Sequence, residues 1–114
     1  MIERTGPGPT LHRVVKKGDL LFISGLTAED KSGDMYAQTK DIAARLDKAL
    51  ASVGSDKTKI LSCTIYITDF DAKDKMNKAW QEWLSPGDMP ARATIGVNEL
   101  GPKTLIEITT IASV

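Results

Sequence analysis

The sequence is poor in the side chains that metal and thiol chemistry require. Its 114 residues include one cysteine, Cys63, and one histidine, His12. A zinc site needs three or four Cys, His or carboxylate ligands in a suitable arrangement, and no such cluster occurs along the chain. Cys63 alternates with Ile65 and Ile67, a pattern typical of a buried strand residue. The composition therefore argues against a metalloenzyme and against a Cys–His hydrolase.

The chain also lacks an excess of either charge. Fifteen basic and fifteen acidic residues give a formal net charge of zero, whereas nucleic-acid-binding proteins normally carry a broad basic surface. Arg13, Lys16 and Lys17 form a local basic cluster, which we interpret as a solvated strand and turn. Nucleic acid is therefore not expected among the partners.

Long apolar segments are missing as well. The sequence has no run of about 18 apolar residues, the length that suggests a membrane-spanning helix. No charged and then apolar leader opens it, so we expect neither a membrane span nor secretion. A lone cysteine cannot form an internal disulfide, so the cytoplasm is the expected location.

The pattern of apolar residues predicts one domain over residues 1–114, because no linker or internal repeat divides the chain. Residues 1–10, rich in glycine and proline, are expected to form an irregular arm. Alternating and helically spaced apolar residues then predict the order β-β-α-β-α-β-β. The expected strands are residues 11–15, 20–24, 60–68, 91–98 and 104–112, and the expected helices are one that Asp34 caps and that runs to about residue 53, and residues 72–84.

This order predicts an α+β fold, a mixed sheet with two helices on the same face. Two helices cover only one face, yet strands 20–24 and 104–112 carry apolar residues on both. Another subunit is therefore needed on the open face. The apolar residues expected there are Phe22 or Ile23, Tyr66, Leu105 and Ile111.

Arg92 and Glu107 are the charges with most chemical interest. If Ala93 and Ile95 meet the helices, Arg92 points to the open face, where a ligand carboxylate fits its planar fork. Glu107, expected in the neighbouring strand, could hold or relay a proton in a half-buried crevice. A permanent ion pair between Arg92 and Glu107 is the structural alternative, and their spacing leaves both open.

Two polar residues are weaker candidates. Ser24 ends its strand beside Gly25, and Asn77 lies on the second helix; each could supply a hydrogen bond in a pocket. Taken alone, both are ordinary surface or capping residues. Trp80 and Trp83 are expected in the core beneath that helix.

Several motifs resemble those of one known family. The strongest is Pro90-Ala91-Arg92, followed fifteen positions after the arginine by Glu107 between two isoleucines. The others are Leu21-Phe22-Ile23-Ser24-Gly25, and Ile65-Tyr66-Ile67-Thr68-Asp69-Phe70 with Met76-Asn77 beyond it. Together they resemble the RidA/YjgF family of reactive-intermediate (imine) deaminases, formerly called endoribonuclease L-PSP, in a divergent branch.

The resemblance implies a chorismate-mutase-like fold and a homotrimer, with a central barrel and ligand clefts between subunits. In deaminating members an arginine binds the carboxylate of a 2-imino or enamine acid, and water releases ammonia and a 2-keto acid. By position, Arg92 would bind the carboxylate and Glu107 would place or activate the water. Ser24, Asn77 and Thr94 would contact the substrate. No metal or organic cofactor is implied.

The chain departs from better-studied deaminases at two places. They carry a tyrosine where this chain has Leu11 or His12, and a cysteine where it has Thr94. One alternative is a non-catalytic trimer that binds a small carboxylate metabolite, which Arg92 would serve equally. Another is an endoribonuclease or translation inhibitor, an activity attributed to some relatives, against which the zero net charge argues.

Overall fold

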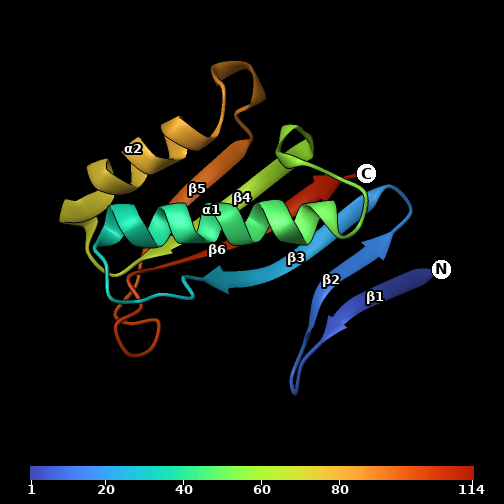
Figure 1. The fold of residues 1–114 in the computed structure, drawn as a ribbon, viewed down its shortest axis with the longest axis horizontal. Helices are drawn as coiled ribbons and strands as arrows, with labels where there is room; N and C mark the ends of the chain where they lie inside the picture. Colours follow the sequence, from blue (N-terminus) through green and yellow to red (C-terminus); the bar gives the residue numbers. More distant parts are fainter.

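The computed structural model describes residues 1–114 and has two layers, a mixed six-stranded sheet and two helices that cover one of its faces (Figure 1). The predicted α+β architecture is therefore confirmed. The strands are β1 (Ile2–Pro7), β2 (His12–Lys17), β3 (Leu20–Thr27), β4 (Ile60–Ile67), β5 (Ala91–Gly96) and β6 (Ile106–Ser113). The helices are α1 (Met35–Ala51) and α2 (Lys73–Trp83), with short 3-10 turns at Lys57–Lys59, Phe70–Ala72 and Pro86–Asp88.

The strands are arranged in the order β1-β2-β3-β6-β4-β5. Neighbours are antiparallel except β4 and β5, which are parallel and are joined by the crossover helix α2. A parallel pair needs such a crossover, whereas antiparallel neighbours can be joined by short turns. As a result β5 lies at one edge of the sheet with α2 packed beside it, and β1 forms the other edge.

The expectation of an irregular arm over residues 1–10 was wrong. Residues Ile2–Pro7 form the edge strand β1, antiparallel to β2, with Pro7 opposite His12. None of its residues is buried, so no alternation of apolar residues marked it as a strand. An edge strand also accepts proline, whose presence suggested a loop.

Helix α1 begins and ends close to where its sequence signals lie. The Asp34 side chain accepts a hydrogen bond from the Ala37 N–H at 3.0 Å and so caps the helix. Ile42, Leu46 and Leu50 are fully buried against the sheet, as their spacing predicts. Neither helix has the length and apolar character that crossing a membrane requires.

The face of the sheet opposite the helices exposes apolar side chains. Phe22 and Ile111 pair across β3 and β6 and are 43% and 37% exposed. Ile95 on β5 is 44% exposed. Of the two alternatives Phe22 and Ile23, Phe22 lies on this face and Ile23 is buried in the core. The prediction was wrong for Leu105, which precedes β6 and packs against the core. Tyr66 is half-buried, on the row of Ile95 and so on the open face.

Candidate functional site

Arg92 lies on the face of the sheet that α2 covers, which corrects the prediction that it points to the open face. In the register of β4 and β5, Arg92 pairs with Cys63 and Thr94 pairs with Ile65, and both partners are buried in the core. Residues paired in register share a face of the sheet. Ala93 and Ile95 alternate with Arg92 and Thr94 along β5 and therefore lie on the open face.

The Arg92 guanidinium is held by an aromatic ring and a sulfur atom. Its central carbon lies 5.5 Å from the centre of the Trp80 ring, a cation–π distance. Nη1 donates weakly to Met76 Sδ at 3.8 Å, and none of the three ion pairs in the molecule includes Arg92. Partial burial lowers the pKa of the guanidinium, which nonetheless stays charged. Most of its five donors are left available to a ligand.

A cavity of about 380 Å³ opens beside this guanidinium, and we call it the Arg92 cavity. It lies between α2 and β5 and is lined by Asn77, Trp80, Gln81, Met89, Pro90 and Arg92.

Two buried oxygen atoms next to Arg92 have no hydrogen-bond partner in the chain. They are Oδ1 of Asn77, which lines the cavity, and Oγ1 of Thr94, two positions along β5 on the same face. Leaving a buried polar atom unpaired costs free energy and calls for an explanation. The fold thus places Asn77 beside Arg92 in the lining of the cavity and Thr94 two positions along β5, and the oxygens of Asn77 and Thr94 are both buried without a partner in the chain.

The other two predicted site residues form a second group around the bend in β3. A Cβ on Gly25 would overlap the carboxylate of Glu107, so only glycine leaves room for that side chain. The adjacent Ser24 Oγ accepts a hydrogen bond from Arg13 Nη1 at 2.9 Å. Ser24, Gly25 and Glu107 are therefore close together, with Arg13 beside them.

These two groups are separate within one chain. Strand β4 lies between β6, which carries Glu107, and β5, which carries Arg92, so the expectation of neighbouring strands was wrong. Glu107 pairs with Tyr66, whose other partner is Ile95, and this row faces away from Arg92. The permanent Arg92–Glu107 ion pair is absent within the chain, since the two side chains lie on opposite faces of the sheet.

Sequence reasoning missed the role of Arg13, which we had interpreted as solvated. Its guanidinium is hydrogen-bonded to Ser24 Oγ and to the Gly25 carbonyl oxygen, the latter at 3.2 Å. Both partners are eleven or twelve residues away along the chain, so no local pattern reveals the contact. Trp80 is buried as predicted. Its ring also contacts the Arg92 guanidinium, which could not be foreseen because the contact depends on where β5 lies in the sheet.

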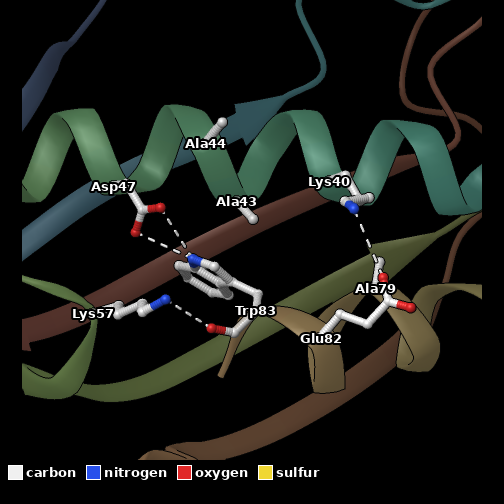
Figure 2. A pocket seen from close by; sticks show the side chains of 8 residues that line it. All are labelled: Lys40, Ala43, Ala44, Asp47, Lys57, Ala79, Glu82 and Trp83. Carbon is white, nitrogen blue, oxygen red and sulfur yellow. Dashed lines mark hydrogen bonds and ion pairs between the residues drawn. The ribbon is translucent and has the colours of Figure 1, made fainter. Parts of the chain in front are cut away.

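A second cavity, of about 240 Å³, lies between α1 and α2 (Figure 2). The Trp83 indole N–H donates to both Asp47 oxygens at 3.1 and 3.2 Å, and Lys57 Nζ donates to the Trp83 carbonyl oxygen at 2.9 Å. Lys40 pairs with Glu82 across the helices at 3.7 Å. Because these polar groups are paired with one another, the contacts join the two helices and do not call for a ligand.

Cys63 is a buried structural residue, as predicted. Its sulfur lies 3.5 Å from Thr110 Oγ1. Burial raises the pKa of the thiol, and the Thr110 hydrogen bond opposes this only in part. No group of three or more His, Cys, Asp or Glu side chains is arranged to hold a metal ion.

We expect the Cys63 thiol to be protected in the folded protein. An aromatic disulfide reagent at mildly alkaline pH should react slowly with native protein and rapidly once denaturant exposes the thiol, because the thiolate is the reacting form. The absorbance of the released thiolate measures both rates. Equal rates in the two states would contradict the structural assignment.

Comparison with known proteins places the chain in a family. The family model described as Endoribonuclease L-PSP matches residues 4–114. A RutC family protein from Haemophilus ducreyi is 32% identical over 114 residues, covering 100% of this chain and 97% of the relative. The chain belongs to the YjgF/RidA/L-PSP family.

Solved YjgF structures share the whole fold. A YjgF family member from Neisseria meningitidis superposes with a TM-score of 0.94 at 33% identity, covering 99% of this chain and 94% of that one. An uncharacterized protein from Pseudomonas aeruginosa gives the same TM-score at 30% identity, covering 99% and 98%. The predicted family is therefore confirmed over nearly the full length.

Proposed function

We propose that this YjgF/RidA family member hydrolyses small 2-imino or enamine acids to 2-keto acids and ammonia, in cytoplasmic homotrimers with clefts between subunits. The observation that carries the proposal is the Arg92 cavity. A charged guanidinium with available donors lines it together with Asn77, whose buried Oδ1 lacks a partner. Thr94, two positions along β5 on the same face, carries a second buried oxygen without a partner. The family includes imine deaminases, and their substrates carry a carboxylate and a nitrogen with N–H groups.

The side chains of Arg92, Asn77 and Thr94 match those two groups of the substrate. Arg92 binds the carboxylate through two parallel hydrogen bonds, the geometry in which a guanidinium is most specific. The ring of Trp80 restrains the guanidinium, so little freedom is lost on binding. Asn77 and Thr94 oxygens then accept hydrogen bonds from the imine or enamine nitrogen, which orients the C=N carbon for attack.

Glu107 of a neighbouring subunit supplies the base in this proposal. Its carboxylate takes a proton from water while the water oxygen bonds to the imine carbon, and the C=N electron pair moves to nitrogen. Glu107 returns that proton to nitrogen, which leaves an amine and a hydroxyl on the same carbon. The hydroxyl proton then passes through Glu107 to nitrogen, and ammonia leaves as the C=O bond forms. An enamine first moves a proton to its carbon and becomes an imine. One water is consumed for each keto acid and ammonia released.

The shared cleft is supported by the separation of the two groups. A single chain offers no carboxylate beside the Arg92 guanidinium, and Glu107 lies on the open face together with exposed Phe22 and Ile111. A second copy that covers this apolar face would bring its own β5 edge, and Arg92 with it, toward Glu107. One subunit contact would therefore both cover the exposed apolar face and bring a carboxylate to Arg92.

A keto-acid assay tests this function. Imino acids generated freshly by an amino-acid oxidase should release keto acid faster with the wild-type protein than in buffer. We expect Arg92→Ala to lower kcat/KM at least about tenfold, because a charge-assisted contact to the substrate is lost. Arg4→Ala, which removes an exposed guanidinium from β1, is the matched control and should retain full activity. No release above buffer by wild-type protein would reject catalysis.

The non-catalytic binder is the second candidate, and the absence of a carboxylate from the Arg92 cavity favours it. Glu107→Gln separates the two functions, because it removes the proposed base and leaves Arg92, which binds the substrate carboxylate, unchanged. An enzyme loses turnover with this substitution and keeps its affinity for a keto acid. A protein that only binds shows no turnover to lose.

A further inference from the structure

A third part of the surface carries positive charge that the chain does not neutralise. A groove of about 280 Å³ lies where β2 and the end of β3 meet α1, and we call it the basic groove. It is lined by Arg13, Leu26, Glu29, Arg45, Lys48 and Ala49. We propose that the basic groove binds a small phosphate-type oxyanion, either free or as the phosphate group of a metabolite.

Both guanidiniums of the groove are anchored by the backbone. Arg45 Nη1 donates to the Thr27 carbonyl oxygen at 2.7 Å, and Arg13 Nη1 donates to the Gly25 carbonyl oxygen at 3.2 Å. Each hydrogen bond uses Nη1, so Nε and Nη2 of both side chains have no partner in the chain. A phosphate group accepts parallel hydrogen bonds from such forks, and anchoring lowers the entropy lost on binding.

The positive charges in the groove are not paired with acids. The three ion pairs of the molecule are Lys16–Glu3, Lys40–Glu82 and Lys75–Asp34, and none lies in the groove. Glu29 is the one carboxylate in the lining and makes no ion pair there. The nearby Asp41 is occupied, because its oxygens accept the backbone N–H groups of Glu29 and Asp30. Three cations therefore face one carboxylate.

The two arginines of the groove also repel each other. Partial burial lowers the pKa of the Arg13 guanidinium, and the nearby charge of Arg45 lowers it further. Two like charges held close together in a partly desolvated groove destabilise each other. An oxyanion between them replaces that repulsion with attraction, and Lys48 supplies a third positive charge. The groove excludes Arg92 but shares Arg13 with the group around Ser24 and Glu107. Arg45, Lys48 and Glu29 have no part in the proposed deaminase reaction, so substitutions at these three residues test phosphate binding separately.

Titration calorimetry with inorganic phosphate at low ionic strength tests the proposal. We expect wild-type protein to bind phosphate and Arg45→Gln to bind it about 10- to 100-fold more weakly, the loss typical of a hydrogen bond to a charged group. Lys17→Gln removes a charge from an exposed position outside the groove and is the matched control. Its affinity should equal that of the wild type.

Glu29→Gln should change the phosphate affinity in the opposite direction, because it removes the one carboxylate that lines the groove. Phosphate should bind this variant more tightly than wild type, an outcome that a merely destabilising change does not produce. Lys48→Gln, at an exposed position near the end of α1, gives a second loss of affinity if Arg45→Gln fails to fold. The proposal is overturned if wild-type protein binds no phosphate at millimolar concentration, if Lys17→Gln weakens binding as much as Arg45→Gln, or if Glu29→Gln binds no more tightly.

Discussion

Arg92→Lys is expected to weaken the binding of small carboxylates by about 1.5–3 kcal/mol, or roughly 10- to 100-fold. Lysine keeps the positive charge but loses the two-pronged geometry. Its ammonium also does not present a planar guanidinium to the ring of Trp80, which lies 5.5 Å from the central carbon of Arg92. Titration with a 2-keto acid, the product of the proposed reaction, measures the loss.

The stability of the Arg92→Lys protein should change little. The guanidinium makes no ion pair in the chain, and its contact with the Trp80 ring is worth about 0.5–1 kcal/mol at a partly hydrated site. Thermal unfolding of both proteins without ligand checks this. The opposite pattern, a clearly lower Tm with unchanged affinity for keto acids, would mean that Arg92 is a structural residue of the assembly.

Most of the fold was predictable because burial imposes a simple period on most elements. Ile42, Leu46 and Leu50 follow the helical spacing and are all fully buried. Cys63, Ile65 and Ile67 follow the strand spacing and are buried beneath the helices. The strand β1 was not predicted because none of its residues is buried. It is held by backbone pairing with β2, which does not require any particular pattern of side chains.

The face of Arg92 could not be predicted for a related reason. Along β5 the sequence alternates small or apolar residues with Arg92 and Thr94, which normally indicates that the apolar set faces the helices. Here β5 is an edge strand and the apolar set lies on the open face, where Ile95 is 44% exposed. The period of two fixes which residues share a face but leaves open which face they occupy. The motif therefore identified the site residues, and the register was needed to place them.

The separation of Arg92 and Glu107 leads to a prediction for mixed assemblies. Arg92→Ala and Glu107→Gln should each remove most of the activity when every subunit carries the change. In a cyclic trimer, each cleft takes Arg92 from one subunit and Glu107 from the next. If the two variants are refolded together in equal amounts, about a quarter of the clefts therefore contain both native residues.

Keto-acid release by the mixture should then recover to about a quarter of the wild-type rate, although neither parent is active. Sedimentation of the same samples must show trimers, because a monomer has no shared cleft. A chain carrying both substitutions, mixed equally with wild type, is the control. Shared clefts again leave about a quarter of the sites intact, whereas sites within one chain leave about half. No recovery in the first mixture together with half activity in the second would place the whole site in one chain, which the opposite faces of Arg92 and Glu107 argue against.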